Sequence, residues 1–447
     1  MSREIQFDSD LPDVLAPADG SQLVTEYVLI DNEYARIDGV LRRHRRGNAH
    51  TVVVQTHPRR TSAMNLSAWP MNNLAGRDFD TFAFNNRATN SAAGTEVITI
   101  WENLALDMAS AVAEMRRRGY LHVVLYGHSA GGPLVSYYQN VAENGSAALG
   151  GETSLSGFTG YQEEGRELRL PPADAIITQS STTGTAYSLL MRLDGSVMNE
   201  DLGTRDPELN PFLAANGFDV ETGKADYSEH FVKTYFAAQC ARMNRLVDRA
   251  REMRDACRAG RGSFLDDELI VIRGIRGELS CVDLSLASRT TQPRLISSSG
   301  APSVVASNRR VVPDYAIRNS SFRDGGTVHT LKSFLSYRAI TGDPTQWNPD
   351  SVTLSSCGLD LSSSNTTTSV NISGVSVPIL LTAGTADTQV HLPAAELMLN
   401  SAVHTSDKQL VFIDTAEHDM TPTEARVADT RAQHLTVVAG WLAERFS

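Results

Sequence analysis

The chain has 447 residues, of which 41% are hydrophobic and 21% charged, so it has enough apolar material for a folded core and is not globally disordered. Its formal net charge of −12 at pH 7 disfavours nucleic acid and anionic membrane surfaces as partners. The first 20 residues contain no basic stretch followed by an apolar run, and no segment approaches the roughly 18 apolar residues of a membrane span. We therefore expect a cytoplasmic protein with an irregular N-terminal arm over residues 1–20.

Strands that alternate with helices make up the first and last parts of the chain. Runs of mixed polarity at 23–30 and 35–44 are typical of an antiparallel pair at a sheet edge. The other expected strands are short and mostly apolar, and they lie at 51–56, 80–86, 122–127, 173–180, 377–384 and 409–414. The spacing of apolar residues predicts helices over 63–74, 100–118, from Leu134 onward, 392–402 and 424–446. This alternation predicts a doubly wound α/β core with a mainly parallel sheet.

The stretch from 183 to 370 interrupts the alternation. It contains a long amphipathic helix over 227–258 and Ser/Thr-rich pieces such as 361–369. The apolar stripe of this helix is typical of a packing face, and its arginines are expected to be solvated: Arg242, Arg245, Arg249, Arg251, Arg254 and Arg258. We therefore expect one insertion over 183–370 between two parts of the core, 21–182 and 371–447.

The pentapeptide GHSAG at 127–131 places Ser129 between an expected strand and an expected helix. A serine on such a sharp turn has a strained backbone, and Gly127 and Gly131 allow the strand and the helix to approach each other. The serine hydroxyl then lies at the carboxyl edge of the sheet, beside backbone N–H groups that can stabilise an oxyanion. A G-x-S-x-G arises easily by chance, so it is this strand-to-helix position that makes Ser129 the candidate nucleophile.

A serine nucleophile needs a base, and the base needs an acid that orients it. In this class of enzyme the three residues occur along the chain in the order serine, acid, histidine. Asp387 directly follows the expected strand at 377–384, and His418 follows the last expected strand in the same way. We therefore assign His418 as the general base and Asp387 as the acid.

Other residues near these positions are weaker candidates. Asp414, Glu417 and Asp419 lie too close to His418 in the sequence to come from a separate strand end, and are expected to shape its loop. His391 is expected to begin the next helix. A carboxylate from another strand is the alternative to Asp387.

Two backbone N–H groups are expected to bind the oxyanion. Ala130, the residue after the nucleophile, supplies the first. The second should come from the loop THPRRT that follows the strand at 51–56, where Pro58 has no N–H and Arg59 is the expected donor. Arg59 and Arg60 are also candidates to attract an anionic group of the substrate, and His128 is a candidate substrate contact. The alternative is that the arginines are exposed loop charges and that His128 is only a neighbour of the serine.

At three motifs the sequence resembles the α/β-hydrolase superfamily: GHSAG at 127–131, GTAD at 384–387 and the histidine loop at 415–419. The resemblance covers 20–182 and 371–447. It implies an α/β-hydrolase fold with a large, mostly helical cap inserted after the sixth strand, which covers the active site and sets specificity. The insertion stands where that cap would be, although it is unusually long. The loop THPRR departs from the HG and HGGG signatures of better-known subfamilies, so their substrates are not carried over.

These features predict a serine hydrolase that cleaves a carboxylic ester or lactone of a small to medium organic substrate through an acyl-enzyme on Ser129. The same triad serves C–C bond hydrolysis or acyl transfer in a second interpretation, and a non-catalytic ligand-binding protein is the third. Four aromatic residues of the insertion are candidates to line a pocket, although such residues more often form core: Tyr235, Phe236, Phe334 and Tyr337.

No cofactor or metal is expected. The four cysteines form no C-x-x-C pair and have no histidine at metal-ligand spacing, so reduced structural cysteines are expected: Cys240, Cys257, Cys281 and Cys357. A small-molecule substrate is the expected partner, and a homodimer is one option for the oligomeric state.

Overall fold

The structure is a computed structural model. It describes residues 23–45, 47, 49–57, 61–63, 74–75, 77, 79–89, 99–148, 169–263, 267–275, 278–279, 283, 286, 290–296, 302–304, 326–347, 357–387, 389–390, 392–423 and 429–447. The expected N-terminal arm and most of the helix expected over 63–74 lie outside these residues.

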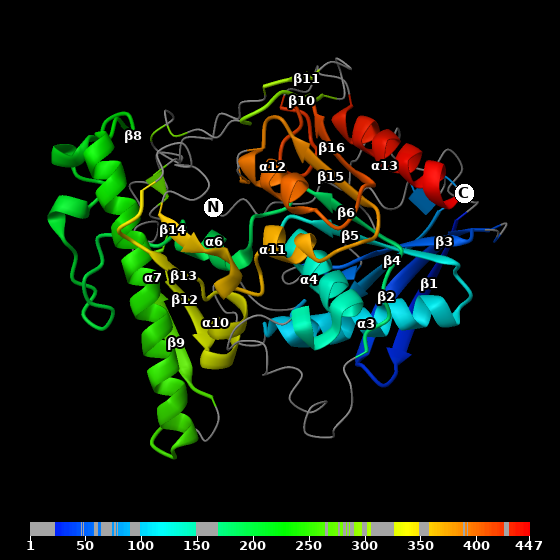
Figure 1. Ribbon diagram of the computed structural model, residues 1–447, viewed down its shortest axis with the longest axis horizontal. Helices are drawn as coiled ribbons and strands as arrows, with labels where there is room; N and C mark the ends of the chain where they lie inside the picture. Colours follow the sequence, from blue (N-terminus) through cyan, green and yellow to red (C-terminus); the bar gives the residue numbers. More distant parts are fainter. Residues whose placement is uncertain are drawn as a thin grey trace.

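An eight-stranded sheet in the order β1-β2-β4-β3-β5-β6-β15-β16 runs through the centre of the molecule (Figure 1). Its strands are β1 (Leu23–Asp31), β2 (Arg36–His44), β3 (Thr51–Gln55), β4 (Asp80–Asn85), β5 (His122–His128), β6 (Ala175–Gln179), β15 (Ile379–Gly384) and β16 (Lys408–Ile413). The strands from β4 to β16 in this order are parallel, whereas β1 and β2 form an antiparallel pair at one edge. The predicted mainly parallel sheet with an antiparallel edge pair is confirmed.

Helices cover both faces of this sheet. Because neighbouring residues of a strand point to opposite faces, Val52 and Val54 of β3 pack with α3 (Trp101–Arg117), α4 (Gly131–Asn144) and α12 (Leu392–Ser401). Val53 faces the other way, into the cluster around α13 (Thr430–Phe446). The core is therefore doubly wound, as predicted. The helix expected from Leu134 begins earlier, at Gly131.

The chain between β6 and β15 forms the insertion, which therefore follows the sixth strand. Figure 1 shows its helices α6, α7 and α10 on the left, whereas β10 and β11 lie at the top, above β16. Its helices are α6 (Thr185–Leu190), α7 (Glu229–Arg258), α10 (Leu331–Tyr337) and α11 (Thr368–Ser373), with the 3-10 turns η5 (Pro207–Leu209), η6 (Ala214–Asn216) and η10 (Leu361–Ser363). Short antiparallel pairs accompany them: β7–β8 (Phe218–Asp219, Lys224–Ala225), β9–β12 (Leu269–Arg273, Gly326–Thr330), β10–β11 (Arg294–Leu295, Pro302–Ser303) and β13–β14 (Thr341–Asp343, Gly358–Asp360). The boundaries 183 and 370 stay a prediction.

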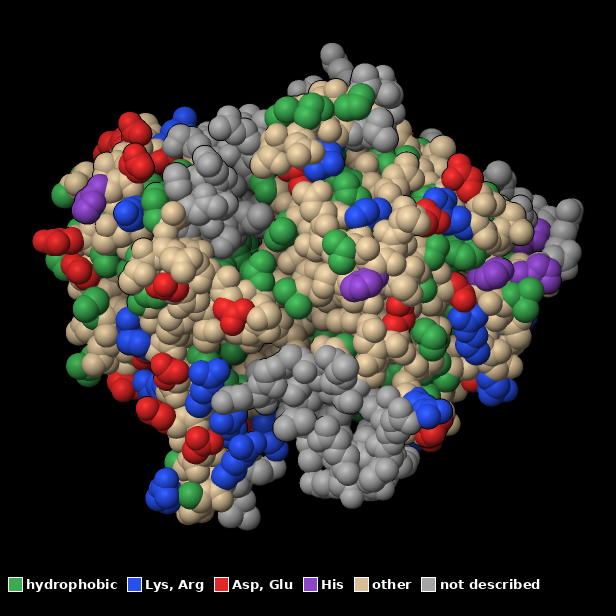
Figure 2. Space-filling model, viewed as in Figure 1, with side chains coloured by type: hydrophobic (Ala, Val, Ile, Leu, Met, Phe, Trp, Pro, Cys, Tyr) green, Lys and Arg blue, Asp and Glu red, His purple; other side chains and the backbone are tan. Residues whose placement is uncertain are grey.

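The long helix α7 confirms the expected packing stripe but corrects the prediction for one arginine. Arg242 is 0% exposed, pairs with Glu200 at 2.6 Å, and donates to the carbonyl oxygens of Asp194 and Gly274 at 2.9 Å. The position of Arg242 on the helix, beside the apolar stripe, does not reveal these acceptors, because they lie far away in the sequence. The later arginines are partly or fully exposed, and Figure 2 shows Lys and Arg side chains gathered at the lower left, over the C-terminal half of α7. Of the described helices, none is long and apolar enough to cross a membrane.

The aromatic residues suggested as pocket lining are core residues instead. Their side chains are at most 5% exposed and belong to hydrophobic clusters: Tyr235, Phe236, Phe334 and Tyr337. The described cysteines Cys240, Cys257 and Cys357 are buried and none of them is in a disulfide, and Cys281 lies outside the described residues.

The insertion is joined to the core at the start of α3. The residue before this helix, Ile100, provides no side-chain cap for it. Ser336 of α10 replaces the cap, because its hydroxyl accepts from the N–H of Trp101 at 2.8 Å and donates to the carboxylate of Glu102 at 2.5 Å. Ser333 adds a hydrogen bond to the carbonyl of Thr99 at 2.9 Å. A fully buried carboxyl group therefore lies at the junction between core and insertion.

Candidate active site

Ser129 lies on the turn between β5 and α4, as predicted. Its φ of 55° is in the left-handed region, which is strained for a residue with a side chain. The turn is held by the N–H of Ser129, which donates to the carbonyl of Gln179 on β6 at 2.9 Å, and by the N–H of Gly132, which donates to the carbonyl of Ser129 at 3.1 Å. This is the strand–turn–helix geometry of a nucleophile elbow.

Glycines make this turn possible. A Cβ at Gly127 would lie 2.4 Å from the carbonyl oxygen of Gly131, so the strand and the helix approach each other as closely as the sequence predicted. Gly132 is required as well, since a Cβ there would lie 2.0 Å from the hydroxyl oxygen of Ser181. Gly132 was not predicted from the sequence, although the glycine that directly follows the pentapeptide GHSAG is a visible signal.

His418 and Asp387 lie together at the ends of neighbouring strands. Parallel pairing of β15 with β16 places their carboxyl ends side by side, and the Nδ1 atom of His418 lies 2.9 Å from the Oδ2 atom of Asp387. The other carboxylate oxygen of Asp387 accepts from the N–H groups of Gln389 at 2.8 Å and Val390 at 3.1 Å. The predicted acid and base are thus in direct contact.

Asp387 is suited to remain ionised in this position. Its side chain is 1% exposed, and burial by itself would raise its pKa. The charge and hydrogen bond of His418, with the two backbone N–H groups, outweigh burial and hold the pKa of Asp387 below its ordinary value. An ionised carboxylate accepts a hydrogen bond from Nδ1–H, so in the neutral imidazole the lone pair is on the Nε2 atom of His418.

The competing carboxylates have other partners. Asp414 accepts from the hydroxyl of Thr385 at 3.5 Å, and Asp419 accepts from Thr421 at 2.5 Å. These two residues therefore shape the histidine loop, as predicted. His391 lies outside the described residues.

His128 contacts the histidine loop. Its Nε2 atom lies 3.2 Å from the carbonyl oxygen of His418, and the centroids of the two rings are 4.9 Å apart. Burial, followed by the neighbouring His418 and His57, lowers the pKa of His128 well below its ordinary value, so the ring is neutral at pH 7. A carbonyl only accepts, so Nε2 of His128 carries the proton and donates it. The role of His128 as a substrate contact stays a prediction.

The expected oxyanion donors are only partly described. Ala130 directly follows Ser129 at the start of α4, and its N–H makes no backbone hydrogen bond to a described residue outside that helix. The predicted second donor, Arg59, lies outside the described residues, as does Arg60. The loop that carries them is anchored by Asn86, whose side-chain amide donates to the carbonyl of His57 at 2.6 Å. The sequence analysis missed Asn86, although it is a polar residue at the end of the strand expected at 80–86.

A small cavity lies between the insertion and the loop that carries Asp387. It has a volume of about 30 Å³ and lies where α6 approaches the loop after β15. Its walls include Thr182, Tyr187, Met191, Gln389 and Val390. The N–H of Thr182 donates to the carbonyl of Ser129 at 3.2 Å, and Gln389 and Val390 bind Asp387, so the insertion reaches the surroundings of two predicted site residues.

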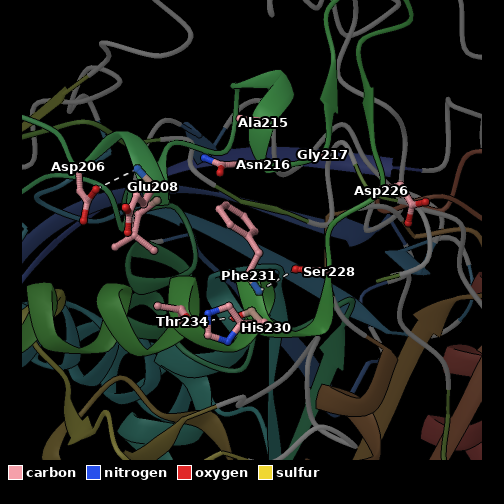
Figure 3. Close-up of a pocket in the computed structure, with 11 residues that line it drawn as sticks. Asp206, Glu208, Ala215, Asn216, Gly217, Asp226, Ser228, His230, Phe231 and Thr234 are labelled. Carbon is pink, nitrogen blue, oxygen red and sulfur yellow. Dashed lines mark hydrogen bonds between the residues drawn. The ribbon is translucent and has the colours of Figure 1, made fainter.

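A larger cavity of about 500 Å³ lies in the insertion, near η5, η6 and the start of α7 (Figure 3). The carboxyl groups of Asp206, Glu208 and Asp226 and the ring of Phe231 are part of its lining. Several of its polar side chains already have backbone partners: Asp206 accepts from the N–H of Glu208 at 2.9 Å, and Ser228 from that of Phe231 at 3.2 Å. The side chains of Asn216 and Thr234 likewise donate to backbone carbonyls. Of the predicted site residues that the structure describes, none lines this cavity.

Comparison with known proteins gives remote structural likenesses. No protein-family model matches the sequence, and no similar sequence is found among curated proteins. The structure of DcsB in complex with its substrate analogue is similar at 10% identity and a TM-score of 0.45, over 95% of this chain and 99% of that one. A soluble variant of monoglyceride lipase from Saccharomyces cerevisiae is similar at 11% identity and a TM-score of 0.42, over 95% and 96%. The esterase domain of a Rhodothermus marinus protein is similar at 11% identity and a TM-score of 0.38, over 95% and 98%.

The fold assignment follows from the chain's own topology. The switch in strand order places β3 between β4 and β5, and the carboxyl ends of strands beside such a switch are where α/β proteins bind ligands. Ser129 follows β5 at this point, and Asp387 and His418 follow the last two strands. With its eight-stranded mainly parallel sheet, its serine elbow after β5 and its insertion after β6, the chain has the α/β-hydrolase fold.

Proposed function

We propose that the protein is a serine hydrolase that cleaves a carboxylic ester or lactone through an acyl-enzyme on Ser129. The observation that carries the proposal is the pairing of His418 with Asp387, at 2.9 Å, in loops beside the strained elbow of Ser129. A loop histidine with a purely structural role does not require a buried, ionised aspartate on its Nδ1 atom. This arrangement supports a base whose Nε2 atom is free to take a proton.

In the proposed reaction the Nε2 atom of His418 removes the proton from the hydroxyl of Ser129 as its oxygen attacks the substrate carbonyl. The N–H of Ala130 and a second donor from the loop after β3, for which Arg59 is expected, stabilise the oxyanion. His418 then returns the proton to the leaving alkoxide, and an acyl-enzyme remains on Ser129. Water activated by His418 releases the acid and restores the serine.

The test is a panel of p-nitrophenyl esters and lactones with product analysis, applied to the wild type, Ser129→Ala and Ser406→Ala. Ser406 is an exposed serine just before β16, at the opposite edge of the sheet, so its variant is a matched control. We expect turnover by the wild type and the control and none by Ser129→Ala. Turnover that survives in Ser129→Ala contradicts the proposal, and products of C–C cleavage or of acyl transfer would replace the ester assignment.

A further inference from the structure

The loop that carries His418 is attached to its neighbours on both sides of the histidine. Before it, the N–H of Thr415 donates to the hydroxyl of Thr385 at 2.7 Å, and after it the hydroxyl of Thr430 donates to the carbonyl of Met420 at 2.7 Å. Thr415 and Met420 have φ angles of 58° and 62°, so left-handed residues stand on both sides of His418. Asp387 fixes the tautomer and the plane of the imidazole ring, but its hydrogen bond reaches only one ring nitrogen. A shift of the loop backbone would still change the distance between the base and Ser129.

His128 adds an attachment at the backbone of His418 itself. It is the last residue of β5 and directly precedes Ser129, so it shares the rigid base of the elbow. Its neutral ring donates from Nε2 to the carbonyl of His418 at 3.2 Å and packs against the His418 ring at 4.9 Å with an interplanar angle of 47°. One side chain therefore connects the backbone of the candidate nucleophile to the backbone of the candidate base.

We propose that His128 is a positioning residue, which holds the main chain of His418 at a fixed distance from Ser129 through its Nε2–H. The inference rests on the proposed function and replaces the earlier expectation that His128 contacts the substrate. Two attachments then position the base: Asp387 holds the side chain and His128 holds the main chain. This role requires an N–H donor within hydrogen-bond distance of the carbonyl of His418, because an aromatic ring without a donor supplies only packing.

The test compares His128→Gln with His128→Phe. The side-chain amide of glutamine places an N–H close to the position of Nε2, and phenylalanine keeps a ring but has no donor. His122, at the other end of β5 with its ring 5.1 Å from that of Phe446, provides the matched control His122→Phe. For each variant we would measure kcat and KM on a neutral ester, the melting temperature, and the rate of labelling by a fluorophosphonate.

We expect His128→Phe to lower kcat and the labelling rate by about 10- to 100-fold with little change in KM, because small misplacements of a catalytic group have effects of this size. His128→Gln should recover kcat to within about threefold of the wild type, since it restores a single neutral hydrogen bond. His122→Phe should leave kcat unchanged. If His128→Phe does not fold, His128→Asn takes its place, because its shorter amide does not reach the carbonyl.

Three results would overturn the inference: an unchanged kcat in His128→Phe, an equal loss in His128→Gln, or an effect confined to KM. The last of these would return His128 to substrate binding. Activity that persists in Ser129→Ala refutes the proposed function whatever the His128 variants do, so the two failures are distinguishable.

Discussion

Glu102 gives a quantitative test of the junction between the core and the insertion. Its carboxyl group is 0% exposed, and one of its oxygens accepts from Ser336 while the other has no hydrogen-bond partner among the described residues. Burial raises the pKa of Glu102 to about 7 from an ordinary value of 4.5, against the opposing effects of the Ser336 hydroxyl and a backbone N–H. The folded protein therefore holds this proton more tightly than the unfolded chain does.

The sign of the pH dependence follows from the raised pKa. The stability contributed by the bound proton is fully present below pH 4.5 and is lost as the pH rises through about 7. The difference between the two pKa values, at about 1.36 kcal/mol per pH unit, amounts to about 3 kcal/mol above pH 8. Glu102→Gln is neutral at every pH and keeps an acceptor for Ser336, so it should be up to about 3 kcal/mol more stable than the wild type at pH 8.5 and nearly equal to it at pH 4.5.

Urea unfolding at pH 4.5, 7 and 8.5 measures this difference. Glu114→Gln on the same helix is the control, because the hydrogen bond from Arg117 is the largest influence on its carboxylate and its pKa is lowered. The Glu114→Gln variant should be less stable than the wild type at every pH above the pKa of Glu114, and so should show no gain in stability at pH 8.5. Curves for Glu102→Gln and the wild type that stay parallel from pH 4.5 to 8.5 would refute the reasoning, because Glu102 would then keep the same charge in the folded and unfolded states.

Three further substitutions test other parts of the structure. Arg242→Met leaves buried acceptors unpaired and should lower the free energy of unfolding by about 3–5 kcal/mol. The control Arg249→Ala removes a surface ion pair and should lower it by less than about 1 kcal/mol. Equal urea midpoints for the two variants would show that the buried pair does not stabilise the insertion. Gly127→Ala should lower the free energy of unfolding by about 1–3 kcal/mol through overpacking and should also reduce esterase activity. The control Gly440→Ala on α13 should leave the stability unchanged or slightly increased. A Gly127→Ala variant that is active and as stable as the wild type would refute the close approach of strand and helix at the elbow. Asp387→Asn should reduce kcat by about 10⁴-fold in ester hydrolysis, and near-normal turnover would move the acid role to another residue.

The sequence predicted the parts of the fold that depend on local patterns. Short apolar runs identified the strands, and the polar residues directly after them identified Ser129, Asp387 and His418, because parallel strands bring their carboxyl ends to one edge. The contact of His418 with Asp387 follows from chain order and this geometry alone. The elbow was also recognisable, since glycines on both sides of a serine are a local signal.

Features that depend on distant partners were not predictable in this way. Arg242 occupies a position that looks solvated on a helical wheel, but Glu200 and several backbone carbonyls, which lie far from it in the sequence, make it a buried residue. Ser336 caps α3 from a position 235 residues later in the chain, and no motif near Trp101 indicates this partner. The short antiparallel pairs of the insertion have too few residues to show an alternating pattern.

The central claim is that Ser129 is a nucleophile activated by His418. Labelling with a fluorophosphonate, followed by peptide mapping, tests it most directly because the probe reacts with activated serines whatever the natural substrate is. We expect one adduct on Ser129, none in Ser129→Ala, and labelling slowed by orders of magnitude in His418→Ala. Absence of an adduct on the folded wild type, or an equally rapid adduct on Ser129 in His418→Ala, would contradict it.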